Sequence, residues 1–249
     1  MLSTVFSDRR LRDTFLADLS AWMETQRWYS AKGTGTPTLK VAGWVRLVST
    51  PRRTTTFATF EADDGQRFAI PLTWTYLADV ALDDSAAMIT TIDTPNGIVY
   101  VSDATAVAEA RAMLVEGLCR EKVEGEGIAL ETRLDEPDAL SCSDLLNSLV
   151  STERHSGEQS NTSLIATCPD GSRIIIKIFR HLHEGDNPDI AIQRALHDAG
   201  NTRIAPFLGS VHMVDAVGPS DVALIQTFLP EVQDAWKQAL MAASSGESF

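Results

Sequence analysis

A lysine inside a hydrophobic strand, and the polar loop that precedes it, are the residues of this sequence best suited to chemistry. Lys177 is flanked by Ile176 and Ile178 in a run rich in β-branched residues, which predicts a strand. The loop from Gly157 to Ser163 offers backbone amides and small polar side chains that can hydrogen-bond phosphate oxygens. Together they could hold a polyanion, although a loop with one glycine is also typical of an ordinary polar turn.

The elements around Lys177 read as strand, turn, strand and helix. Thr162 to Thr167 and Ile174 to Phe179 are the two strands, and Pro169-Asp-Gly171 is the tight turn between them. A helix then runs from Pro188 to Ala199. Asn187 suits its N-cap, proline suits its first position, and a glycine follows its end.

Three blocks of this stretch carry a resemblance to a known family. They are Glu-Gln-Ser-Asn-Thr-Ser, Ile-Ile-Lys-Ile-Phe-Arg and Gly-Asp-Asn-Pro-Asp-Ile, in this order. The wording closely resembles bacterial maltokinases and related sugar 1-kinases, which have the aminoglycoside-phosphotransferase-like kinase fold. Those enzymes transfer the γ-phosphoryl group of ATP to maltose or a similar sugar.

The resemblance implies a set of nucleotide-binding residues and cofactors. ATP and Mg²⁺ are the implied cofactors, with Lys177 paired to the phosphates. The segment Gln226 to Pro230 resembles the hinge where an adenine binds through backbone groups. The implied binding residues are Ser160, Asn161, Thr162, Ser163, Lys177, Gln226 and Phe228.

The sequence departs from the family pattern at two places. The family has a helix glutamate that pairs with the strand lysine, and Ala191 occupies that position here. We therefore expect Ala191 to face Lys177, and we expect the lysine to be poorly placed. Glu184, Asp186 or Asp189 could substitute, although Asp189 is more simply a carboxylate favoured by the helix dipole. The sequence also ends at Phe249, before the large lobe that supplies the family's catalytic aspartate and metal ligands.

The N-terminal part predicts a small α+β unit. Ser7 suits the cap of a helix from Asp8 to Arg27, and Gln26 to Gly33 resembles the start of the maltokinase N-terminal cap domain. Trp28 and Tyr29 favour simple core packing. Strands are predicted at Leu39–Val48, Thr55–Glu61, Arg67–Leu72, Met88–Ile92 and Ile98–Val101, with turns at Asp63-Asp-Gly65 and Thr94-Pro-Asn-Gly97.

The C-terminal part predicts a second antiparallel sheet. Asp103 suits the cap of a helix through Leu118, and a last helix spans Val232 to Ala243. The remaining strands are predicted at Ile128–Leu134, Phe207–Val214 and Val222–Phe228. The fold class is thus α+β: an N-terminal cap with an antiparallel sheet over residues 1–103, then a protein-kinase-like small lobe over 104–249. This lobe should hold a five-stranded antiparallel sheet plus a helix, with the large catalytic lobe absent.

Composition limits the classes of function. Hydrophobic residues are 44% and charged residues 22% of the 249, as in ordinary globular proteins. The net charge of −13 disfavours nucleic acid and anionic membranes as partners. Three widely spaced cysteines, and an N-terminus that lacks a signal-peptide core, indicate a cytoplasmic protein without disulfides or zinc. His181 and His183 are expected to be surface histidines, and a Ser-His-Asp set cannot be identified without long-range contacts.

Two classes of function remain open. The first is a non-catalytic, pseudokinase-like module that binds a partner or regulates sugar, trehalose or glycogen metabolism. Its partner would be a missing catalytic lobe or another enzyme of sugar metabolism. The second is the front portion of an active sugar kinase, acting on maltose or an amino sugar, whose catalytic lobe lies outside this chain. Both readings predict at most weak ATP binding and no phosphoryl transfer by this chain alone.

Overall fold

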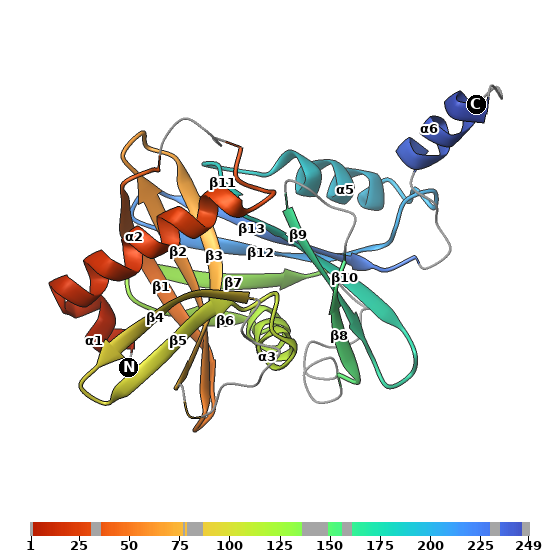
Figure 1. Cartoon of the computed structure of the whole chain (residues 1–249). Helices are drawn as coiled ribbons and strands as arrows, with labels where there is room; N and C mark the ends of the chain where they lie inside the picture. Colours follow the sequence, from red (N-terminus) through yellow and green to blue (C-terminus); the bar gives the residue numbers. More distant parts are fainter. Residues whose placement is uncertain are drawn as a thin grey trace.

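The protein is built from two antiparallel sheets that share a core, with one helix between them and other helices packed outside them (Figure 1). The computed structural model describes residues 2–30, 36–76, 78, 87–135, 149–155, 161–229 and 235–245. The arrangement confirms the α+β expectation of a cap followed by a kinase-like small lobe.

The first sheet is formed by the N-terminal strands in the order β1-β2-β3-β5-β4. Tight turns at Gly65 (φ +83°) and Gly97 (φ +116°) connect its hairpins, as predicted, because glycine adopts positive φ without steric cost. The strands are β1 (Leu39–Ser49), β2 (Arg53–Ala62), β3 (Arg67–Tyr76), β4 (Met88–Thr94) and β5 (Gly97–Asp103).

Two helices cover one face of this sheet, α1 (Leu2–Ser7) and α2 (Arg9–Thr25). Figure 1 shows α2 lying across the strands. Its apolar stripe packs on strand residues such as Phe60 and Trp74, and the predicted core residues Trp28 and Tyr29 join the same cluster. Asp8, not Ser7, caps α2, because the Asp8 carboxylate accepts a hydrogen bond from the Leu11 amide while Ser7 ends α1.

The second sheet has seven strands rather than the five predicted, in the order β6-β7-β12-β13-β10-β9-β8. The additional strands are short pieces at its edges, β6 (Lys122–Glu124) and β8 (Ser151–Arg154). The longer strands are β7 (Ile128–Leu134), β9 (Asn161–Thr167), β10 (Arg173–Phe179), β12 (Phe207–Asp215) and β13 (Pro219–Thr227).

The hairpin that carries Lys177 forms as predicted. β9 and β10 pair from Arg173↔Thr167 to Phe179↔Asn161, so Lys177 lies opposite Ser163. In the connecting turn, Asp170 accepts hydrogen bonds from the amide and hydroxyl of Ser172, which lower the pKa of its carboxyl group. The register of the hairpin is therefore fixed by its turn.

Helix α3 (Ala108–Leu118) lies between the sheets and helps to build one core from both. Phe57 of the first sheet, Leu114 of α3 and Ile176 of the second sheet belong to this shared core. The prediction that Asp103 caps the helix is wrong. Val107 holds the N-cap position, and Asp103 ends β5 as a buried carboxylate.

The backbone joins the two sheets at two further points. The two-residue strand β11 (His181–Leu182) follows β10 and pairs with β3 of the first sheet. Near β6, the amides and carbonyls of Trp44 and Glu126 exchange two hydrogen bonds of 2.8 Å. The polypeptide thus passes from the second sheet back into the first.

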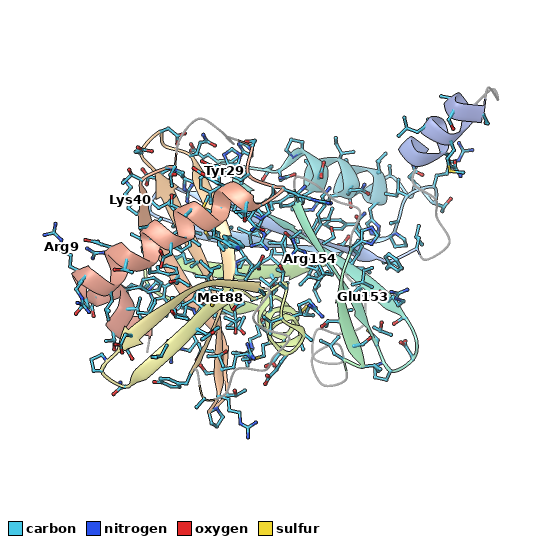
Figure 2. All side chains as sticks on the ribbon, in the orientation of Figure 1. Arg9, Tyr29, Lys40, Met88, Glu153 and Arg154 are labelled. Atoms are coloured by element: carbon cyan, nitrogen blue, oxygen red, sulfur yellow. The ribbon has the colours of Figure 1, made fainter. Side chains whose placement is uncertain are left out.

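Two helices follow in the C-terminal part. Helix α5 (Pro188–Asp198) packs on β12 and β13, while α6 (Ala235–Ser245) projects away from the body of the molecule (Figure 1). Figure 2 labels side chains of both sheets, among them Glu153 and Arg154 of β8 and Tyr29, which follows α2. None of the helices in the described part of the chain is long and apolar enough to cross a membrane.

Candidate functional site

Lys177 forms an ion pair with a carboxylate of α5. Its Nζ lies 2.7 Å from Oδ2 of Asp189, and the lysine side chain is only 23% exposed. The expectation of a poorly placed lysine is therefore wrong, because Asp189 supplies the carboxylate. Of the three candidates that the sequence offered, Asp189 is the one that the structure brings to Lys177.

The N-terminus of α5 explains why Asp189 can reach the sheet. The Asn187 side chain accepts a hydrogen bond of 2.9 Å from the Asp189 amide, which caps the helix as predicted. Asp189 lies in the first turn, where the helix dipole favours a negative charge. The Asp189 carboxylate therefore interacts favourably with the helix dipole and also pairs with Lys177.

Ala191 does not face Lys177, which corrects the sequence-based hypothesis. Successive helix residues are about 100° apart, so Ala191 lies about 200° around the helix from Asp189. Ala191 is exposed, whereas its neighbour Ile190 is buried against the sheet. Lys177 therefore has a helix carboxylate despite the alanine at position 191, because Asp189 supplies it.

The predicted phosphate-facing residues divide between the two faces of the sheet. Ser163 shares the Lys177 face; its Oγ is buried and has no hydrogen-bond partner among the described residues. Thr162 points to the opposite face, where its Oγ1 accepts a hydrogen bond of 2.9 Å from Nε of Arg180. The Thr162 hydroxyl is thus used in the core and is not presented to a ligand. Ser160 lies outside the described residues.

The predicted hinge residues lie at the other end of the same face. Gln226 is opposite Ile175, two residues along β10 from Lys177. The Phe228 amide donates a 2.9 Å hydrogen bond to the Arg173 carbonyl, and the Arg173 guanidinium lies 4.4 Å from the Phe228 ring centre. Because that amide is already bonded, an adenine would need a different backbone group of this segment.

A cavity of about 670 Å³ lies where the cap, the end of β10 and the start of α5 meet. Asp189 and Asn161 line it, so the cavity adjoins the ion pair of Lys177. Its other lining residues are Trp28, Ser30, Phe179, His181, His183, Asp186, Asn187 and Pro188. Two sheets and a helix terminus thus converge on a space of the size of a small-molecule site.

His181 and His183 lie together in the wall of this cavity. Their ring centres are 4.6 Å apart with nearly perpendicular planes. His181 is half-buried rather than on the open surface, and burial, followed by the nearby His183, lowers the pKa of its imidazole. Within the described ranges, no three His, Cys, Asp or Glu side chains are grouped as a metal ion requires.

A fully buried arginine behind the cavity joins the cap to the small lobe. Nη2 of Arg180 lies 2.9 Å from Oδ2 and 3.1 Å from Oδ1 of Asp103, and the guanidinium is 5.6 Å from the Trp28 ring centre. Burial lowers the pKa of Arg180, and the Asp103 carboxylate opposes this effect. Sequence reasoning missed this pair. A charged residue that directly ends the apolar run of β10 was the available signal.

The arrangement defines a class of protein: a kinase-like fold with a strand lysine held by a helix carboxylate. Two structures of glucosamine kinase are similar to it, each with a TM-score of 0.50. One, in complex with glucosamine, ADP and inorganic phosphate, is 16% identical; the match covers 95% of this chain. The other, in a second crystal form, is 15% identical, with 94% of this chain covered. The chain spans 46% and 45% of their lengths, respectively.

Within this class, the family of the N-terminal part is more specific. Residues 22–106 match the model of the maltokinase N-terminal cap domain family. This match confirms the resemblance noted in the segment after α2 and extends it through strands β1 to β5 of the first sheet.

Proposed function

We propose that this chain is the nucleotide-binding front half of a maltokinase-like sugar kinase and does not transfer a phosphoryl group on its own. The ion pair between Lys177 and Asp189 carries the proposal. A strand lysine held by a helix carboxylate is the arrangement with which kinase-like folds orient ATP phosphates. Ser163 and Gln226 share its face of the sheet, and the cavity beside Asp189 provides space.

The proposed nucleotide lies along the face of β10, with the base toward Gln226 and Phe228 and the phosphates toward Lys177 and Asn161. The cavity wall contains Asp186 and Asp189, so uncompensated phosphates would meet negative charge. Mg²⁺ would accompany the phosphates, since this ion is commonly held by one or two carboxylates together with substrate phosphates.

Phosphoryl transfer needs more than this half supplies. Kinases position the acceptor and stabilise the transferring group with a catalytic aspartate and metal ligands, which the second lobe provides. We therefore expect weak ATP binding and no phosphorylation of maltose, glucose or glucosamine by this chain alone.

A second candidate function is a partner-binding module that regulates sugar metabolism without phosphoryl transfer. Helix α6 favours it, because Leu240 and Met241 are 51% and 69% exposed on a helix that projects from the body (Figure 1). A separate catalytic lobe or another enzyme of sugar metabolism would cover these side chains.

Calorimetric titration with ATP and Mg²⁺ tests the proposed nucleotide site. We expect Lys177→Met to abolish the binding seen with the unaltered chain. Lys40→Met is the matched control, because Lys40 forms a 2.8 Å ion pair with Glu61 away from the cavity. Equal binding by the unaltered chain and Lys177→Met would refute the site. Sugar phosphorylation by the purified chain would refute the proposal that it does not transfer a phosphoryl group on its own.

A further inference from the structure

A chain of buried polar side chains connects α5 to the sheet beneath it. Oγ of Ser210 lies 3.0 Å from Nε2 of His212, and Nδ1 of His212 lies 2.6 Å from Oδ1 of Asp221. Both ends of the chain reach α5. Arg194 donates to Ser210 Oγ at 3.0 Å, and the Asn187 amide donates to Asp221 Oδ2 at 2.6 Å.

The separations of Ser210, His212 and Asp221 are those of a nucleophile, a base and an orienting acid. Their burial excludes that role. Ser210 is 0% exposed, His212 9% and Asp221 5%, under the helix and within the sheet. A substrate carbonyl has no path to the Ser210 hydroxyl. The same contacts suit a structural connection.

The contacts along this polar chain are of two kinds, hydrogen bonds and one close polar contact. Nδ1 of His212 lies 2.6 Å from Oδ1 of Asp221, a buried oxygen that has no hydrogen bond of regular geometry among the described residues. Nε2 of His212 and Oγ of Ser210 share a hydrogen bond, and the same Oγ accepts one from Arg194. Oδ2 of Asp221 accepts from the Asn187 amide, so the polar contacts run from Arg194 to the N-cap of α5.

The two contacts on α5 bracket the residue that holds Lys177. Asn187 precedes Asp189 by two residues and caps the helix, while Arg194 lies within its second half. His212 and Asp221 are direct neighbours across β12 and β13, so they form a rigid base. The apolar contacts of α5 are centred on Ile190 and Phe207. Because apolar contacts are non-directional, they restrict rotation about the helix axis less than hydrogen bonds do.

We propose that Asp221, supported by His212 and Ser210, is a positioning residue that fixes the start of α5 and thereby aims Asp189 at Lys177. Its consequence for ATP rests on the proposed function, but the positioning itself can be measured without nucleotide. An amine in an ion pair reacts slowly with an acylating reagent, so the reactivity of Lys177 reports how well Asp189 holds it.

The experiment is limited acetylation of the whole chain, with the modified lysines quantified by mass spectrometry. Lys40, also ion-paired but remote, is the internal reference. Asp221→Ala should raise the Lys177-to-Lys40 ratio about threefold, which is the size expected for losing one partly exposed ion pair. Asp189→Ala removes the ion-pair partner itself and therefore gives the largest Lys177-to-Lys40 ratio expected. Asp221→Asn retains an oxygen for the Asn187 amide and should restore most of the protection.

Ile190→Val is the matched control, because it weakens the apolar attachment of the same helix and leaves the polar chain intact. Equal ratios in Asp221→Ala and the unaltered chain, or equal increases in Asp221→Ala and Ile190→Val, would overturn the proposal. If Asp221→Ala does not fold, Ser210→Ala replaces it in the test. An unchanged Lys177-to-Lys40 ratio in Ser210→Ala would then overturn the proposal. Failure of ATP to protect Lys177 in the unaltered chain would instead refute the nucleotide site alone.

Discussion

At the level of single side chains, the buried ion pair of Arg180 and Asp103 is expected to contribute strongly to the unfolding free energy. Asp103→Ala leaves the Arg180 guanidinium without its carboxylate inside the core. Breaking a buried pair in this way costs about 3–5 kcal/mol of unfolding free energy. Urea denaturation measures it. Glu61→Ala, which removes an exposed pair with Lys40, is the control and should cost less than about 1 kcal/mol; equal losses would contradict this account.

Ala191→Glu tests the orientation of α5 at the same scale. The side chain is exposed, so the new carboxylate remains in water and the unfolding free energy should change by about 0.5 kcal/mol or less. ATP binding should not improve, because position 191 points away from Lys177. Thermal melts and calorimetry measure the two effects. Ile190→Glu is the contrast, and it should unfold the helix because a buried carboxylate is costly.

At the level of elements, the crossing of β1 and the loop after β6 allows no added side chain. A Cβ on Gly125 would lie 2.1 Å from the Trp44 carbonyl oxygen and 2.7 Å from the Val45 Cα. These are backbone atoms, which cannot move aside without breaking the crossing. Gly125→Ala should therefore destabilise more than Gly65→Ala, whose cost of about 1 kcal/mol comes from its positive φ alone. Similar midpoints in denaturant would contradict the tight crossing.

Elements with local signals could be predicted from the sequence. The turn at Gly171, the pairing of Thr162–Thr167 with Arg173–Phe179 and the cap at Asn187 all depend on neighbouring residues. Asp103 could not be assigned, because its partner Arg180 lies 77 positions away and its local pattern resembles a helix cap. The same limit hid the chain from Ser210 to Asp221, whose members belong to two strands. The pairing of Lys177 with Asp189 required the rotation of α5, which periodicity alone does not fix.

At the level of the whole molecule, the shared core predicts a single unfolding transition. Four of the five tryptophans, at positions 22, 28, 44 and 74, precede the second sheet, so their fluorescence reports on the cap. Hydrogen exchange at β10 and β13 reports on the small lobe. Both should lose structure at one denaturant midpoint, because Phe57 and Ile176 belong to one cluster. Two separate midpoints would show that the units are independent.

The half-buried His181 gives this stability a defined pH dependence. Its pKa is lowered in the folded state, below its ordinary value of 6.5. Between the two pKa values the unfolded chain binds more protons, so unfolding free energy rises with pH in this window. The contribution of His181 to the unfolding free energy is fully present above pH 6.5 and is lost as the pH falls below that value. His181→Gln should reduce the acid loss in urea titrations, and an unchanged loss in this variant would contradict the role of His181.

Because β11 pairs with β3, the order of synthesis determines when the first sheet can be completed. Asp103 leaves the ribosome before Arg180, and 77 positions separate them. At about 5–20 residues per second, the nascent cap waits roughly 4–15 s for the arginine that neutralises its buried carboxylate. The last strand of its sheet, His181–Leu182, arrives only then. A protease supplied during translation should cut the emerging cap until that moment, and the completed chain should resist it.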